Sequence, residues 1–113
     1  MRPVRLRSLT AALVAIGLAL GCAAARADDI DAGRAKAQAC AVCHGPLGVS
    51  TQPDAPNLAG QPALYVAAQL RAYRSGARRH EVMSVMAKPL GDDDIAQLAA
   101  WFAAIRVEAS APR

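Results

Sequence analysis

The stretch CAVCHG, residues 40–45, brings together three side chains that bind metals or take part in redox chemistry. Cys40, Cys43 and His44 are three and four positions apart, so on a helix they share one face. Only one other cysteine, Cys22, and one other histidine, His80, occur in the chain. Whatever this motif binds must be enclosed by the rest of a short chain, and this requirement restricts the possible folds.

Residues 1–27 have the composition of an export signal. Arginines come first, an apolar run follows, and small residues lead up to Ala27. Such a signal is removed after small residues, so we expect a periplasmic protein whose folded domain covers residues 28–113. The apolar run is short for a membrane anchor. The letters LALGC around Cys22 loosely resemble a lipoprotein processing site, which leaves a lipid anchor on Cys22 as the one alternative that involves a membrane.

The positive charge of the chain lies in this leader. The formal net charge is +4, but four of the 13 lysines and arginines precede residue 28, and all nine acidic residues lie at or after it. The domain therefore has nine residues of each sign and no excess positive charge for phosphates. We expect no nucleic-acid partner.

Three helices are predicted in the domain. An alanine-rich segment with acidic residues at its start predicts a helix over residues 28–44. Pro62, expected at the first helical position, and Gly76, expected as the carboxyl-terminal cap, delimit a second helix over 61–76. A third helix over 91–106 begins with Gly91 or Asp92 as its cap and has acidic residues in its first turn. Its apolar period predicts a buried face made of Ile95, Leu98, Ala99, Phe102 and Ile105.

Two long segments without a helical period separate these helices. Residues 45–60 are rich in proline and glycine, and residues 77–91 contain Met83 and Met86. A loop as long as the first is uncommon in a small domain unless it surrounds something. Aromatic residues make up only 4% of the chain. A core this small usually needs a disulfide, a metal or a cofactor.

The C-x-x-C-H pattern has four chemical interpretations. A redox dithiol normally lies at the start of a helix in a βαβ context, but here the motif ends a helix and no strand is evident. A structural zinc site needs a second pair of ligands, which the domain lacks. A disulfide between Cys40 and Cys43 would close a very small loop and stabilise little. Covalent haem attachment also accounts for the loops and the core, so we predict one haem c on Cys40 and Cys43 with His44 as an iron ligand.

Four stretches together resemble the small bacterial class I cytochromes c of the c-553 type, and one half of the tandem di-haem cytochromes c. They are CAVCHG, PNLAGQP, YVAAQLRAYRSGAR and MSVMAKPLGDDDIAQLAAWF. They follow the order of the family and cover nearly all of the domain. The resemblance implies an all-α cytochrome c fold, with three main helices and two long loops around one covalently bound haem.

The same resemblance implies roles for single residues. His44 is expected as the proximal iron ligand and Met83 as the distal one, with Met86 as the alternative. The carbonyl of Pro56 is expected to accept a hydrogen bond from the His44 ring, because a ligating histidine needs its other nitrogen held. A histidine from the distal loop, His80, is the remaining alternative for the distal position.

The resemblance also implies that the first and last helices cross at a glycine against an aromatic side chain. The corresponding residues are Gly33 with Trp101 or Phe102. Close approach of two helices requires a small residue at the crossing, so both aromatic residues are expected to belong to the core.

The expected function is that of a one-electron carrier between redox proteins, with no enzymatic activity of its own, present as a monomer or as a subunit of a redox complex. Two alternatives remain. The chain could be the electron-accepting cytochrome subunit of a larger dehydrogenase or oxidase complex, or a ligand-binding haem sensor whose methionine is labile. The basic residues Arg71, Arg74, Arg78 and Arg79 are expected to form a solvated face, or to contact a haem propionate or an acidic partner.

Overall fold

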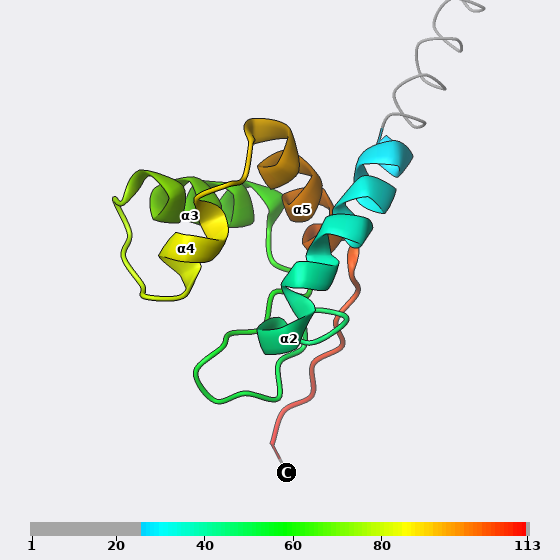
Figure 1. Cartoon of the computed structure of the whole chain (residues 1–113). Coiled ribbons are helices and arrows are strands. Elements are labelled where there is room, and N and C mark those ends of the chain that lie inside the picture. The colour runs from blue at the N-terminus through cyan, green and yellow to red at the C-terminus, as the bar shows by residue number, and fades with distance from the viewer. Residues whose placement is uncertain (1–25, 113) are drawn as a thin grey trace, which may run out of the picture.

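The computed structural model describes residues 26–112, and within this range every regular element is a helix (Figure 1). The predicted all-α class is therefore confirmed. Cys22 and most of the expected export signal lie outside the described residues. None of the helices in the described range is long and apolar enough to cross a bilayer.

The helix that carries the motif follows the prediction closely. Residues 26–36, here called the amino-terminal helix, continue through a tighter turn, η1 (Ala37–Ala39), into α2 (Ala41–His44). The backbone stays helical between them, because the Cys40 N–H donates to the Ala37 carbonyl at 3.0 Å. The predicted helix over 28–44 is therefore present, with one 3₁₀ turn just before the first cysteine.

α3 (Ala63–Ser75) matches the second predicted helix. Gly76 ends it in the left-handed conformation, with φ of 84°, as expected for a carboxyl-terminal cap. Pro62 stands at the amino-terminal cap, one position before the place predicted for it. The shift has a simple cause: its ψ of 133° is extended, so the helix begins only at the next residue.

The segment over 77–91 was predicted to be irregular, but it contains the short helix α4 (Met83–Ala87). Five residues are too few to show a helical period in the sequence. The His80 ring supports the start of α4, because Nδ1 accepts the N–H groups of Val82 and Met83 at 3.2 and 3.3 Å. α4 also packs on α3, so tertiary contacts stabilise a helix that propensity alone would not.

α5 (Asp92–Ala104) is the helix around which the core is built. Gly91 is its cap, as one of the two predicted alternatives. Four of the five residues of its predicted apolar face are buried, and Ile105, just past the helix, is half-buried. One cluster of buried residues joins α5 to α3, and a second joins it to η1. The first contains Val66, Ala67, Ile95 and Ala99, and the second contains Ala37, Leu98 and Phe102.

The amino-terminal helix crosses α5 at Gly33, as predicted. A Cβ atom on Gly33 would lie 2.0 Å from the Gln97 carbonyl oxygen and 2.9 Å from the Trp101 Cβ. Only a hydrogen atom fits in this space, so the two backbones are nearly in contact. Trp101 is the aromatic partner at the crossing, and the guanidinium of Arg34 lies 5.7 Å from the centre of its ring. Phe102 turns instead toward the loop, where it faces Gly48.

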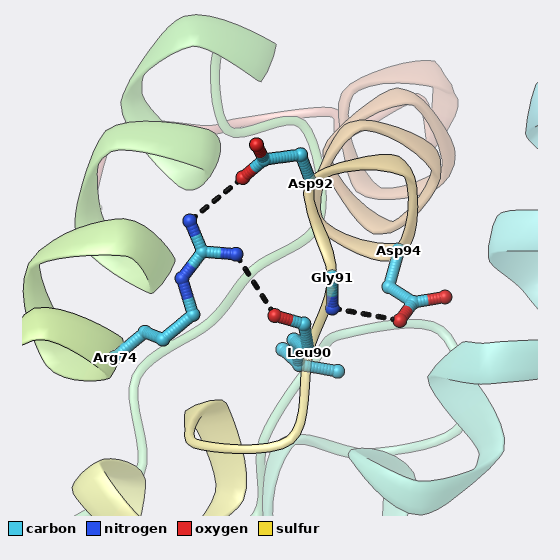
Figure 2. A network of polar contacts seen from close by, with 5 residues as sticks. All are labelled: Arg74, Leu90, Gly91, Asp92 and Asp94. Carbon is cyan, nitrogen blue, oxygen red and sulfur yellow. Dashed lines mark hydrogen bonds and ion pairs between the residues drawn. The ribbon is translucent and has the colours of Figure 1, made fainter.

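Side chains in the first turn of α5 bind the cap of that helix and two other helices; Figure 2 shows the contacts to Gly91 and to Arg74. Asp94 accepts the Gly91 N–H at 2.9 Å and pairs with Lys36 of the amino-terminal helix at 2.8 Å. Asp92 pairs with Arg74 of α3 at 2.7 Å. The acidic residues expected only to favour the helix start therefore also connect α5 to two other helices.

Gly33→Ala should destabilise the protein by about 1–3 kcal/mol, the usual cost of forcing extra atoms into a close contact. Alanine has the higher helix propensity, so a loss of stability can only come from the crossing with Gln97. Denaturant unfolding of the haem-bound protein measures the change. Ala35→Ser, at an exposed position of the same helix, is the control and should change stability by less than about 0.5 kcal/mol. Equal stability of Gly33→Ala and the parent would show that the helices do not approach this closely.

The two ion pairs of α5 predict a loss of stability in acid. The pKa of Asp92 is lowered by its hydrogen bond to Arg74, and the pKa of Asp94 by its hydrogen bond to Lys36. The folded state therefore binds fewer protons than the unfolded state. Their contribution is complete above the ordinary carboxyl pKa of 3.8 and is lost as the pH falls below it toward the folded-state values.

The measurement is the denaturation midpoint of the parent and of an Asp92→Asn, Asp94→Asn variant between about pH 6 and pH 3. Near pH 6 the double variant should be less stable than the parent, and the denaturation midpoints of the two proteins should converge as the pH falls. Asp93→Asn is the matched control, since among the described residues Asp93 makes no ion pair. A constant difference between parent and double variant at every pH would contradict the prediction.

Candidate haem-binding site

The two cysteines of the motif lie one helical turn apart: Cys40 stands between η1 and α2, and Cys43 lies in α2. The His44 N–H donates to the Cys40 carbonyl at 2.9 Å, so the turn that carries all three side chains is continuous. Both thiols are free and half-buried. Burial, and then the neighbouring Cys43, raise the pKa of Cys40. A redox dithiol needs a lowered pKa, so the environment of Cys40 argues against that interpretation.

His44 is buried, with 6% of its surface exposed, and it is the only buried polar or charged side chain in the described range. Its Nδ1 lies 2.7 Å from the Pro56 carbonyl oxygen. A carbonyl can only accept, so Nδ1 carries a proton, and the neutral ring with this tautomer has its lone pair on Nε2. A neutral imidazole with one nitrogen held by a carbonyl is the usual state of a metal-ligating histidine.

The loop over 45–62 holds the Pro56 carbonyl in place. Gly48 closes it upon itself: its carbonyl accepts the N–H groups of Leu58 and Ala59 at 2.7 and 3.0 Å. With φ of +69° and Ala59 N 2.8 Å from where a Cβ would be, this position needs glycine. Directly after Pro56, Asn57 Oδ1 accepts the Ser50 N–H at 2.7 Å.

Ser50 connects this loop to the motif. Its hydroxyl donates to the Cys43 carbonyl at 2.9 Å. The sequence interpretation missed Ser50 and Asn57, although short polar side chains in loops often bind nearby backbone groups. Through these two bonds, Ser50 connects Cys43, the residue before His44, to Asn57, the residue after Pro56.

The two candidate distal methionines lie on α4. Met83 is its first residue and is half-buried, whereas Met86 is 40% exposed. In Figure 1, α4 and α2 lie on the same side of α3 and α5. His80, the remaining alternative, is exposed, and its Nδ1 is occupied by the backbone of α4. The structure thus brings Cys40, Cys43, His44 and Pro56 together and places Met83 on a separate element.

The basic residues of α3 and of the turn that follows it are less free than expected. Arg74 binds both Asp92 and the Leu90 carbonyl. Arg78 donates to Gln69 at 2.6 Å and lies over the Tyr73 ring. The packing of α3 on α5 brings Arg74 to its partners, whereas the partners of Arg78 lie in α3 itself.

The donor set fits a covalently bound haem better than a directly bound metal ion. In the described range no three His, Cys, Asp or Glu side chains gather to hold an ion. Two adjacent free thiols and one oriented imidazole nitrogen are the groups that attach a haem at C-x-x-C-H.

Comparison with known proteins agrees with this geometry. The family model described as cytochrome c matches residues 30–105. Cytochrome c-554(548) of Halomonas halodenitrificans is 42% identical over 79 residues, which are 67% of this chain and 95% of that protein. A cytochrome c4 of Pseudomonas aeruginosa is 41% identical over 93 residues, 80% of this chain and 46% of that protein. The chain therefore spans about half the length of this cytochrome c4.

A solved structure gives the same result for the fold. The reduced cytochrome c4 of Pseudomonas stutzeri superimposes with a TM-score of 0.65 at 34% identity, over 68% of this chain and 45% of that one. The expected resemblance to one half of a di-haem cytochrome is thus confirmed. With the family match and the C-x-x-C-H motif together, the chain belongs to the cytochrome c family: it is a class I c-type cytochrome with the cytochrome c fold, an electron carrier whose cofactor is haem c.

Proposed function

We propose that this chain is a periplasmic one-electron carrier with one haem c, attached through Cys40 and Cys43 and ligated by His44 and Met83. The observation that carries the proposal is the buried His44 ring, whose Nδ1 lies 2.7 Å from the Pro56 carbonyl. This bond directs the free Nε2 away from the loop and fixes the tautomer that binds iron. The haem, when bound, supplies the Fe(III)/Fe(II) couple.

The protein residues have separate tasks. Cys40 and Cys43 hold the cofactor as thioethers on one helical turn. His44 supplies a strong nitrogen ligand that cannot rotate, since Pro56 holds its other side. Met83 supplies a thioether, and His/Met ligation raises the reduction potential. With His44 and Met83 as its ligands, a bound haem iron would have no open position for substrate, and the chain would act by electron transfer without catalysis of its own.

The distal ligand is assigned to Met83 rather than Met86 on two grounds. In the sequence, Met83 occupies the position at which the resemblance places the distal iron ligand, and its side chain is the less exposed of the two. His80 is the weaker candidate, because its ring already caps the start of α4. A labile or absent methionine would instead favour the ligand-binding sensor.

The proposed location rests on the arginines, apolar run and small residues of the first 27 positions, which are typical of export signals. Protein sequencing of the mature amino terminus tests it: a start at Asp28 supports periplasmic export, and a lipid-modified Cys22 would show membrane anchoring.

A second function, as the dedicated electron acceptor of a dehydrogenase, is favoured by one comparison. A protein of Stutzerimonas stutzeri named thiosulfate dehydrogenase electron acceptor is 40% identical over 67 residues, 57% of this chain and 31% of that protein. Gel filtration after gentle lysis separates the two functions. A free carrier elutes as a small monomer, whereas a subunit elutes with a stoichiometric catalytic partner.

Met83→Ala should leave the haem attached but open the iron to carbon monoxide. The reduced parent protein should keep its spectrum under carbon monoxide, because both axial positions are filled, and the variant should convert completely. Met86→Ala is the matched control on the same short helix and should behave as the parent. If Met86→Ala opens the iron and Met83→Ala does not, the assignment of the two methionines is reversed. Prompt binding by the parent itself would support the sensor.

A further inference from the structure

The link between α4 and α5, residues 88–91, is held by a side chain from a third helix. Arg74 of α3 donates from Nη1 to the Leu90 carbonyl at 2.9 Å, and from Nη2 to Asp92 at 2.7 Å (Figure 2). The arginine side chain is 30% exposed, whereas that of Asp92 is 75% exposed. The bond to Leu90 is therefore the better shielded of the two.

This bond acts on α4 through a short chain of contacts. The Leu90 N–H donates to the carbonyl of Ala87, the last residue of α4, at 3.1 Å. Ala87 is completely buried, and the Leu90 side chain packs on both clusters of the core. Arg74 therefore fixes the carboxyl end of a helix that is only five residues long and begins with Met83.

We propose that Arg74 is a positioning residue for the Met83 thioether, which sets how firmly methionine holds the iron without touching it. This inference rests on the proposed function, in which Met83 is the distal ligand. Release of methionine frees α4 to move, and the bond to Leu90 resists that movement. Because coupling between two binding events is reciprocal, the stabilisation must appear as weaker binding of any ligand that displaces methionine.

The test is a titration of the ferric, haem-bound protein with imidazole, followed by the loss of the far-red absorption of methionine-ligated ferric haem. Arg74→Gln should bind imidazole about five- to tenfold more tightly than the parent, the size expected when one hydrogen bond of ordinary net strength is lost. Arg74→Lys keeps the charge and can still donate to the Leu90 carbonyl, but it lacks the rigid fork that places one nitrogen at each acceptor, so it should lie between Arg74→Gln and the parent.

Two further variants separate the bond from the charge. Arg71→Gln removes the same charge from an exposed position of the same helix, where Arg71 acts on Asp92 only through space. Its imidazole affinity should equal that of the parent. Asp92→Asn removes the ion pair but leaves the Leu90 carbonyl available, and it should change the affinity by less than about twofold, as for exposed ion pairs.

An unchanged affinity in Arg74→Gln would overturn the proposal, even if its thermal stability fell, because Arg74 would then be a general stabilising residue. Equal shifts in Arg74→Gln and Arg71→Gln would also overturn it in favour of a charge effect. Carbon monoxide binding to the reduced parent distinguishes a failure of the proposed function from a failure of this inference. Prompt binding there would refute methionine ligation itself, and this inference with it, whereas an inert parent with an unchanged Arg74→Gln refutes this inference alone.

Discussion

The close crossing of the amino-terminal helix over α5 determines where the site is built. Gly33 leaves no room for a side chain between the two backbones, so the direction in which the helix leaves the crossing is fixed. Cys40 follows two turns later. The ion pair between Lys36 and Asp94 holds the same two helices one turn closer to the motif. The position of both cysteines relative to the core therefore depends on the crossing at Gly33, although neither cysteine belongs to that contact.

The core behind this crossing is small, and this gives the cofactor a structural role as well as a redox one. The buried apolar residues include several alanines, and in the described range only three large apolar side chains, Ile95, Leu98 and Phe102, are exposed by 3% or less. Large apolar side chains such as Leu47, Leu64 and Val85 are exposed. Burial of apolar surface is the main source of stability, and a domain of this size has little of it to bury. A haem attached at Cys40 and Cys43 would add both apolar surface and a cross-link.

Sequence periodicity predicted the three long helices because each buries a continuous stripe on another helix. It could not predict α4, whose single turn has no period and depends on the His80 ring and on packing against α3. The motif predicted Cys40, Cys43 and His44 from spacing alone, and the acceptor for His44 came from a family resemblance. Neither spacing nor resemblance could predict the contacts of Ser50, Asn57 and Arg74. Each of these side chains binds a backbone carbonyl or amide, and every type of residue has a backbone carbonyl. Long-range bonds to the backbone leave no trace in a single sequence.

The two proposed axial ligands are supported by different kinds of structure. His44 lies next to a covalent attachment point, in a helix fixed at Gly33, and its ring is held by Pro56. Met83 lies in one helical turn, between a histidine cap and a link held by Arg74. The histidine side has little freedom, whereas the methionine side depends on a few exposed or half-buried polar bonds. A ligand exchange in such a protein would therefore begin at methionine. Evolution could adjust the strength of the methionine bond through residues such as Arg74 without altering the haem-attachment motif.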